Sequence, residues 1–299
     1  MANDIMYNGS LVYLHVGKNK WYLYDSSAPP LGSGAMGTVY MGFAVDNRYD
    51  RVAIKLVNPR YASVPAVRER AKLEASLQFR HPNLVEMLGL CTDDNPQGPM
   101  YIVSRLVRGE NIDRYAKAFD GSPDRVQHIV RAMLPVLDAL DFIHAHGIIH
   151  LDVKPSNIMI EDGRTPRLMD LGIAFTQDAV STTQGGLLGT PGYAAPEQYL
   201  KPGMTRLPLG ASTDVFEAGA TIYELLAGRK PYDHNKQVLA LIQDVPEPVM
   251  QVIATSLALD RNHRYSTARE FKIALESALN APPPTIWDKG LKTISSWFS

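Results

Sequence analysis

The chain has 299 residues, of which 45% are hydrophobic and 20% charged, and a formal net charge of -1. This length and composition fit a globular protein with one large two-lobed domain or two modest ones. The balanced charge gives no reason to expect binding to nucleic acid or to an anionic membrane surface. The single cysteine, Cys91, excludes an intramolecular disulfide. Since neither a secretory signal nor a membrane-spanning apolar run is evident, we expect a cytoplasmic protein.

Residues 1–30 predict an N-terminal β-hairpin extension. The runs Leu11–Val16 and Trp21–Tyr24 are rich in aromatic and β-branched residues and are separated by a glycine-containing turn. We expect these strands to extend the sheet that follows, with a separate regulatory element as the alternative. Pro29 and Pro30 then interrupt the chain, so the next strand should be short or irregular.

A glycine-rich stretch with GxGxxG spacing follows in Leu31–Tyr40. In a dinucleotide-binding fold this spacing opens a helix, but here Thr38–Ala44 has the composition of a strand. Two strands around a glycine loop can form a flap whose backbone amides cover phosphates; a plain glycine-rich hairpin is the alternative. The next run, Val52–Lys55, places a lysine in an apolar strand, which is costly unless the lysine is paired or binds an anion. That lysine favours the phosphate-binding interpretation.

The stretch Ser63–Arg80 has the apolar spacing of a helix and offers two carboxylates that could pair with that lysine. Glu74 and Glu69 each have apolar residues on their own helical face, so both stay open at this point. The apolar runs Leu84–Cys91 and Met100–Leu106 predict two further strands. Together these elements would make a five-stranded sheet with one helix.

A long helix is predicted over Asp124–His146, where apolar residues recur at intervals of three and four. Pro135 lies inside it and predicts a kink without requiring a break. The cluster His144, His146 and His150 could suggest a metal site, but its spacing matches no recognised zinc pattern. We favour a structural role for His150, as a buried anchor beneath the residues that follow it.

Those residues form the most informative stretch of the chain, HLDVKPSN at His150–Asn157, followed by MDLG at Met169–Gly172. Between them, two apolar runs surround the pair Asp162-Gly163, which is a hairpin signal. Because a hairpin brings its ends together, Asn157 and Asp170 should lie side by side. An amide oxygen beside a carboxylate suits a magnesium ion that carries a nucleotide phosphate.

These motifs resemble those of the eukaryotic-like serine/threonine protein kinases, from about residue 31 to residue 278, with HLD in place of HRD and DLG in place of DFG. The resemblance implies an α+β, two-lobed protein-kinase-like fold. A small antiparallel N-lobe sheet with one helix would span about 31–106, and a larger helical C-lobe about 107–280. A Pro-rich linker at 281–284 and an amphipathic segment at 285–299 would follow the kinase domain of 31–280.

The resemblance also implies roles for the central residues. Asp152 would orient the substrate hydroxyl, and Lys154 would neutralise the transferred γ-phosphate. Asn157 and Asp170 would hold Mg²⁺, with Mn²⁺ as the alternative ion. The implied ATP-binding residues are Leu31, Gly32, Gly34, Gly37, Val39, Ala53, Lys55, Glu74, Ser104, Leu106 and Met159.

Further matches lie in the second half of the chain. Thr190, in the stretch Gly189–Gln198, matches the threonine that contacts Asp152 and Lys154 in serine/threonine kinases. Glu197 and Arg264 match a structural ion pair, and Asp214 matches the aspartate that braces the catalytic loop.

One departure from the family pattern concerns regulation. Leu151 stands where the family usually has an arginine that reads phosphate on the activation segment. We therefore hypothesise that activity does not depend on phosphorylation of that segment by this route.

The sequence thus predicts an ATP-dependent kinase of the non-RD type that phosphorylates Ser/Thr hydroxyls of protein substrates and itself. The alternatives are a pseudokinase that acts as a nucleotide-binding scaffold, and a small-molecule kinase that shares the fold. The C-terminal segment places Trp287, Leu291, Ile294 and Phe298 at helical spacing. Its few basic residues favour docking on its own domain or on a partner over membrane association.

Overall fold

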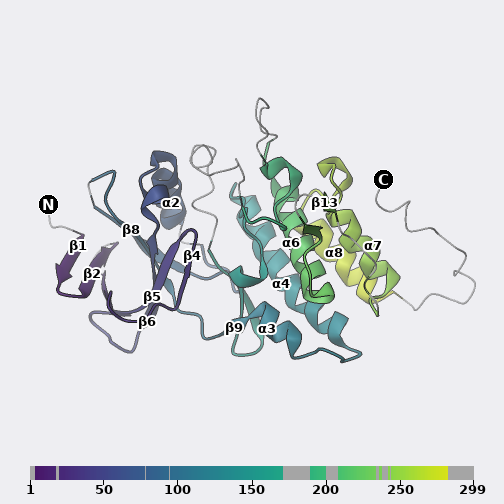
Figure 1. Ribbon diagram of the computed structural model, residues 1–299, viewed down its shortest axis with the longest axis horizontal. Coiled ribbons are helices and arrows are strands. Elements are labelled where there is room, and N and C mark those ends of the chain that lie inside the picture. Colours follow the sequence, from purple (N-terminus) through teal and green to yellow (C-terminus); the bar gives the residue numbers. More distant parts are fainter. Residues whose placement is uncertain are drawn as a thin grey trace, which may run out of the picture. The chain divides into compact units, whose positions relative to one another are not determined.

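Figure 1 shows the chain as a computed structural model. The structure describes residues 4–17, 20–77, 79–93, 95–170, 189–199, 208–233, 236–237, 242 and 244–281. It divides into two compact units, the first running to Arg108 and the second beginning at Gly109. Apart from Ala281, the predicted linker and amphipathic segment lie outside the described residues, as does Leu171 of the DLG motif.

The first unit is built on one antiparallel eight-stranded sheet with the order β1-β2-β3-β5-β6-β8-β7, in which β4 also pairs with β5. The strands are β1 (Ile5–Asn8), β2 (Leu11–Val16), β3 (Lys20–Asp25), β4 (Gly32–Gly34), β5 (Gly37–Ala44), β6 (Arg51–Val57), β7 (Met87–Thr92) and β8 (Met100–Arg105).

The five strands predicted from residue 31 onward are present as β4 to β8, and the N-terminal strands extend the same sheet; β1 is the one strand of the sheet that was not predicted. Leu23 of β3 lies opposite Phe43 of β5 in a direct antiparallel pair. The hairpin of β2 and β3 and its extension of the sheet are therefore confirmed. Residues of β2 alternate between buried and half-buried, as expected of a strand with one face on the core. The two prolines separate β3 from β4, which is only three residues long.

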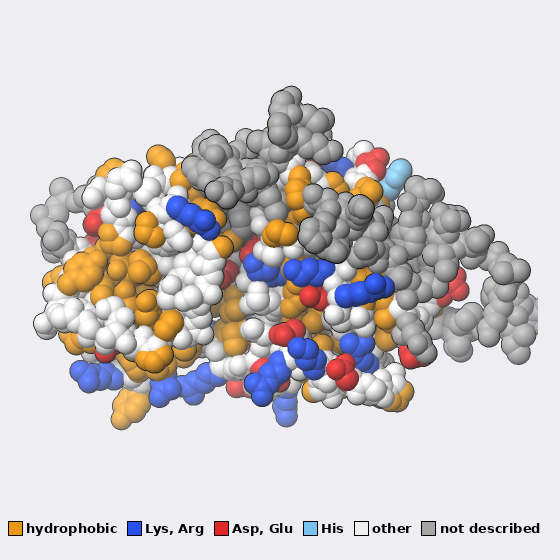
Figure 2. Space-filling view, viewed as in Figure 1, with side chains coloured by type: hydrophobic (Ala, Val, Ile, Leu, Met, Phe, Trp, Pro, Cys, Tyr) orange, Lys and Arg blue, Asp and Glu red, His pale blue; other side chains and the backbone are white. Residues whose placement is uncertain are grey.

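The other face of this sheet carries a row of apolar side chains in cross-strand register, Met6, Tyr13, Leu23 and Phe43. Directly opposite residues in an antiparallel pair share a face, so these side chains are neighbours. Figure 2 shows hydrophobic side chains gathered over the N-terminal strands. Met6 is 46% exposed there.

The helix predicted over Ser63–Arg80 is present as α2 (Pro65–Leu77), and a short helix that was not predicted, α1 (Pro59–Ala62), precedes it. The side chain of Asn58 caps α1 by accepting from the Arg60 N–H at 3.2 Å. Pro65 opens α2, because its fixed φ suits the first helical turn and its missing N–H costs nothing there. The strand predicted from Leu84 begins three residues later, since Leu84 N–H closes a turn on His81.

The second unit is mainly helical. Its elements are β9 (Gly109–Asn111), α3 (Ile112–Lys117), α4 (Arg125–Ala145), η1 (Pro155–Asn157), β10 (Ile158–Glu161), β11 (Thr165–Leu168), η2 (Pro196–Gln198), α6 (Ala211–Ala227), β12 (Tyr232–Asp233), β13 (Lys236–Gln237), α7 (Glu247–Ser256), η3 (Arg261–His263) and α8 (Ala268–Leu279). Helix α4 packs against both α6 and α8. No helix in the described ranges is both long enough and apolar enough to cross a lipid bilayer.

Helices α4 and α6 form the core that supports the site. Helix α4 continues through Pro135, and its apolar stripe is buried. Helix α6 is buried on nearly all sides, including polar residues such as Asp214 and Glu217. A helix buried all round is expected to be apolar, so each polar residue in it requires an internal partner.

The hairpin predicted around Asp162 and Gly163 is confirmed. Strands β10 and β11 pair antiparallel, with Ile158 opposite Leu168. Asp162 and Gly163 have φ values of 51° and 68°, the left-handed conformation that tight hairpin turns require. The hairpin brings its ends together, because the Met169 N–H donates to the Asn157 carbonyl oxygen at 2.9 Å.

Candidate active site

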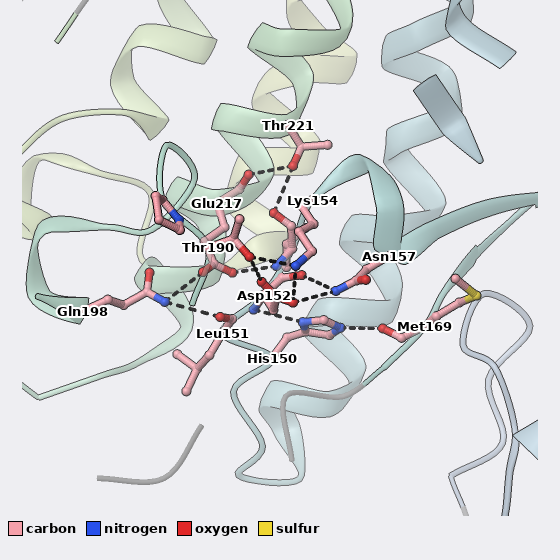
Figure 3. Close-up of polar contacts among 12 residues, drawn as sticks. His150, Leu151, Asp152, Lys154, Asn157, Met169, Thr190, Gln198, Glu217 and Thr221 are labelled. Atoms are coloured by element: carbon pink, nitrogen blue, oxygen red, sulfur yellow. Dashed lines mark hydrogen bonds and ion pairs between the residues drawn. The ribbon is translucent and has the colours of Figure 1, made fainter. Parts of the chain in front are cut away.

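Polar side chains converge on one carboxylate in the loop that joins α4 to β10 (Figure 3). Thr190 Oγ1 donates to Asp152 Oδ1 at 2.6 Å, and Lys154 Nζ lies 2.7 Å from Asp152 Oδ2. The same lysine donates to Thr190 Oγ1 at 2.7 Å. Asn157 Nδ2 donates to Asp152 Oδ2 at 2.9 Å. The structure therefore brings three of the predicted site residues around the 3% exposed Asp152.

Helix α6 fixes the backbone on both sides of Asp152. Asp214 accepts from the N–H groups of His150 and Leu151, each at 2.8 Å. Glu217 accepts from the Val153 N–H at 2.7 Å, and the Thr221 hydroxyl donates to the Val153 carbonyl oxygen at 3.0 Å. These three helix positions, i, i+3 and i+7, share one face. The backbone next to Asp152 is thus held by a row of buried side chains.

His150 anchors the loop from beneath, as predicted, and is fully buried. Its Nε2 lies 2.9 Å from the Met169 carbonyl oxygen, and the Asp152 N–H donates to its Nδ1 at 3.3 Å. Only the neutral ring with a proton on Nε2 makes both contacts. Burial lowers the pKa of His150 despite the neighbouring carboxylates Asp214 and Asp152.

Asp214 is a fully buried acid with several donors around it. Beyond the two backbone N–H groups, His144 Nε2 lies 2.7 Å from its Oδ2. Burial alone would raise the pKa of Asp214, but the hydrogen bonds from His144 and from the Leu151 N–H stabilise the carboxylate, so the pKa lies below its ordinary value. Two members of the histidine cluster therefore contact the machinery around Asp152.

Two residues of the site hold a left-handed backbone conformation that non-glycine residues rarely adopt. Leu151 has φ 65° and Asp170 has φ 52°. Each conformation costs about 1–2 kcal/mol and must be held by its surroundings. At Leu151 the N–H is bound by Asp214, and the carbonyl oxygen accepts from Gln198 Nε2 at 3.3 Å.

Asn157 and Asp170 fit the metal ion that the sequence predicts. The Asn157 amide nitrogen donates to Asp152, so its oxygen is the part of the side chain left for a ligand. Asp170 follows directly after the Met169 N–H that binds the Asn157 carbonyl oxygen. An amide oxygen and a carboxylate at the joined ends of one hairpin are hard ligands of the kind that Mg²⁺ and Mn²⁺ take.

Glu197 and Arg264 form a buried two-point ion pair. Arg264 Nη1 lies 2.7 Å from Glu197 Oε1, and Nη2 lies 3.0 Å from Oε2. The guanidinium also lies over the Phe216 ring, 4.8 Å from its centroid. The pair predicted from the sequence is present, and it joins the turn that holds Glu197 to the residues before α8.

The first unit carries the other predicted nucleotide-binding residues. Val39 of β5 lies opposite Lys55 of β6, and Ala53 lies opposite Ser104 of β8, so these four share one face of the sheet. Strand β4 and β5 form the predicted strand–glycine loop–strand, with Gly34 opposite Gly37. Leu31 and Leu106 adjoin this sheet, whereas Met159 lies in β10 of the second unit.

The partner of Lys55 stays a prediction. Glu74 lies in α2, but its side chain is outside the described part of the structure. The Glu69 carboxylate is exposed and accepts from Lys72 at 2.9 Å on the same helix.

Sequence reasoning missed Glu217, Thr221 and Gln198 as functional residues. Their roles do not follow from a recognised motif, because their partners are backbone groups of another segment and, for Gln198 and Glu217, each other's side chains. One signal was available: polar residues at i, i+3 and i+7 in a helix that is otherwise apolar predict internal hydrogen bonds.

A cavity of about 400 Å³ borders the catalytic loop at Pro155 and Ser156. Its walls include Asp113, Asp120 and Glu224, and the Tyr193 hydroxyl donates to Glu224. The walls also include Lys117 and Arg125, so the cavity is lined by charges of both signs, and it begins at the residue next to Lys154 in the chain.

Comparison with known proteins identifies the family of the chain. Residues 26–285 match the family model described as the protein kinase domain. The chain is 33% identical over 281 residues to the probable serine/threonine-protein kinase PknB of Bifidobacterium longum, a match that covers 85% of this chain and 39% of that protein. It is 30% identical over 269 residues to the serine/threonine-protein kinase PknH of Mycobacterium tuberculosis, covering 84% and 41%. The chain thus spans about two fifths of the length of these relatives.

Among solved structures, the PknI kinase domain of Mycobacterium tuberculosis matches with a TM-score of 0.67 and 23% identity, covering 93% of this chain and 99% of that one. This likeness confirms the fold predicted from the sequence, an N-terminal antiparallel sheet followed by a helical part. The family match covers most of the chain, and the chain therefore belongs to the protein kinase family.

Proposed function

We propose that this chain is an active protein kinase that transfers the γ-phosphate of ATP to serine and threonine hydroxyls of proteins, itself included. The observation that carries the proposal is the triangle of Asp152, Lys154 and Thr190, with all three contacts between 2.6 and 2.7 Å. Phosphoryl transfer requires positioning and charge neutralisation more than covalent help from the protein. This triangle places a hydrogen-bond acceptor for the substrate hydroxyl, Asp152, beside a cation for the phosphate, Lys154.

Asp152 would accept a hydrogen bond from the substrate hydroxyl and orient its oxygen toward the phosphorus. Thr190 and Asn157 each donate to the Asp152 carboxylate, which fixes its rotamer. A carboxylate held in this way need not reorganise when the substrate arrives, and such preorganisation lowers the barrier.

Lys154 would neutralise the negative charge of the γ-phosphate as it moves. Its Nζ carries three donor sites, and two of them are directed at Asp152 and Thr190. The remaining donor suits a phosphate oxygen. The side chain is 20% exposed, so it can be reached by a substrate while its stem is held.

Asn157 and Asp170 would hold Mg²⁺ or Mn²⁺. When bound, the metal would supply positive charge that neutralises the ATP phosphates. Lys55, with Glu74 or Glu69, would hold the α- and β-phosphates, and the glycine hairpin would cover them. The residues that would contact adenine are Val39, Ala53, Ser104, Leu106 and Met159.

The cavity beside Pro155 and Ser156 supports a polypeptide substrate. A peptide that presents a hydroxyl to Asp152 would have neighbouring side chains within reach of a polar cavity of about 400 Å³.

We also place the activity in the cytoplasm, which supplies ATP and a reducing environment. The buried thiol of Cys91 is compatible with that, since burial raises its pKa to about 12.

The test is incubation of the protein with ATP, Mg²⁺ and a basic protein acceptor, with phosphosites mapped by mass spectrometry. We expect phosphate on serine and threonine of the acceptor and of the chain. Nucleotide binding without transfer would instead support the scaffold alternative. Transfer only to an added small hydroxyl compound would support the small-molecule kinase alternative.

A further inference from the structure

Glu217 is a buried acid for which the proposed catalytic roles give no use. It is 0% exposed and lies on the face of α6 that meets the catalytic loop. Its two carboxyl oxygens have separate partners: Oε2 accepts from the Val153 N–H at 2.7 Å, and Oε1 accepts from Gln198 Nε2 at 2.8 Å. Burial and the charges of Asp214 and Asp152 raise the pKa of Glu217 well above its ordinary value.

Gln198 continues this connection. Its Nε2 also donates to the Leu151 carbonyl oxygen at 3.3 Å, and its Oε1 accepts from the Ala195 N–H at 2.6 Å. The amide therefore joins three segments: α6, the catalytic loop and the turn at 195–198. Since Leu151 and Val153 flank Asp152, both neighbours of the catalytic aspartate are tied to one buried pair.

The residue before Thr190 packs directly on that pair. Gly189 has φ 105°, and a Cβ placed on it would lie 2.7 Å from Gln198 Nε2, 3.0 Å from the Leu151 carbonyl oxygen and 3.4 Å from Glu217 Oε1. Only glycine fits there without displacing the pair. Asp152 and Thr190 are thus both preceded in the chain by a residue that lies against this buried pair (Figure 3).

We propose that Glu217, acting through Gln198, is a positioning residue for phosphoryl transfer that holds Asp152 and Thr190 in register. The proposal rests on the kinase function proposed above. The relative positions of Asp152 and Thr190 matter in the transition state. Loss of the contact between Glu217 and Gln198 should therefore lower kcat while leaving the KM for ATP nearly unchanged.

The polarity of the contact allows a sharp test. Glu217→Gln leaves one oxygen for two donors, so it can satisfy either the Val153 N–H or Gln198, but not both. Gln198→Glu places two carboxyl groups face to face. The double variant, which carries both changes, restores a complementary acid and amide with their positions exchanged.

In that double variant, the new carboxylate at position 198 can accept from the Ala195 N–H and from the new amide at position 217. The oxygen of that amide can still accept from the Val153 N–H. Of the contacts described above for Gln198, the 3.3 Å contact to the Leu151 carbonyl oxygen is the one that is lost.

The experiment measures kcat and the KM for ATP of each variant on a basic protein acceptor, with thermal unfolding as a check on folding. We expect about a tenfold loss of kcat in each single variant, less than a threefold change in KM, and recovery to within about threefold of wild type in the double variant. Ser256→Ala is the matched control. It removes another buried polar group packed against α6 at Gly219, away from the catalytic loop, and should change kcat by less than about twofold.

Single variants that keep kcat within twofold of wild type, or a double variant no better than the better single variant, would overturn the positioning role. If wild type itself transfers no phosphate, the proposed kinase function is wrong and the positioning role with it. The double variant keeps one acid and one amide at the buried contact. If one single variant fails to fold, the kcat of the double variant can still be compared with that of the other single variant and of wild type.

Discussion

The hydroxyl of Thr190 donates to Asp152 Oδ1 over 2.6 Å, although 38 positions separate the two residues in the chain. The same hydroxyl accepts from Lys154 at 2.7 Å. One side chain therefore sets the distance between the group that orients the substrate and the group that neutralises the phosphate.

Replacing Thr190 by valine should test that relationship. Valine keeps the shape but removes the hydroxyl, so Asp152 loses a donor and Lys154 loses an acceptor. We expect kcat to fall by about tenfold or more, whereas Thr190→Ser, which keeps the hydroxyl, should stay within about threefold. The measurement is the initial rate of phosphate transfer at saturating ATP. Equal rates for the valine and serine variants would show that the hydroxyl has no role.

The Glu197–Arg264 pair should contribute to stability and not to chemistry. Both side chains are at most 1% exposed, so removal of one leaves an uncompensated buried charge. We expect Glu197→Ala to destabilise the fold by about 3–5 kcal/mol, measured as the free energy of unfolding in urea. The exposed pair Lys72–Glu69 is the control, and Lys72→Ala should cost less than about 1 kcal/mol. Equal effects of the two changes would contradict this assignment.

The buried His150 should make stability depend on pH. Because its pKa is lowered on folding, the unfolded chain binds a proton first as the pH falls. Stability is then complete above the unfolded pKa of about 6.5 and declines as the pH falls toward the lower folded value, by at most about 1.4 kcal/mol per pH unit. The pKa of Asp214 is also lowered on folding, and this carboxyl group contributes to the pH dependence of stability in a separate, more acidic pH range.

The check compares the free energies of unfolding of wild type and His150→Gln at pH 7.5 and 5.5. We expect a larger loss in wild type, because glutamine has no proton to gain. Identical pH dependence in both proteins would mean that His150 is not held neutral.

The catalytic loop was predictable from the sequence because its chemistry is local. Asp152, Lys154 and Asn157 lie within six positions, and the hairpin signal at Asp162 and Gly163 brings the chain back beside Asn157. The supporting contacts were not predictable in the same way. The side chains at 198 and 217 meet only after α6 packs under the loop, so their pairing is set by tertiary structure.

Two elements of the fold were not predicted, for similar physical reasons. The short helix α1 depends on capping by Asn58, which apolar spacing does not register. Strands β2 and β3 were predicted, but the addition of β1 at the edge of the sheet depends on which edges pair. Composition does not fix that choice.

Regulation provides a further prediction. Leu151 is 2% exposed and cannot bind phosphate, so phosphorylation of the activation segment should not be needed for activity through this position. Replacing Ser181, Thr182 and Thr183 together by alanine, positions outside the described residues, should leave the rate within about twofold of wild type. A tenfold loss in the same transfer assay would refute this independence.

The most direct test of the account is the rate of phosphate transfer by Asp152→Asn. Asparagine keeps the size of the side chain and its contact with Thr190 but removes the carboxylate. With the fold intact by thermal unfolding and ATP binding within about threefold of wild type, we predict that transfer to a protein acceptor falls by about 10²–10⁴-fold. A variant that retains transfer within tenfold of wild type would contradict the assignment of Asp152 as the catalytic carboxylate.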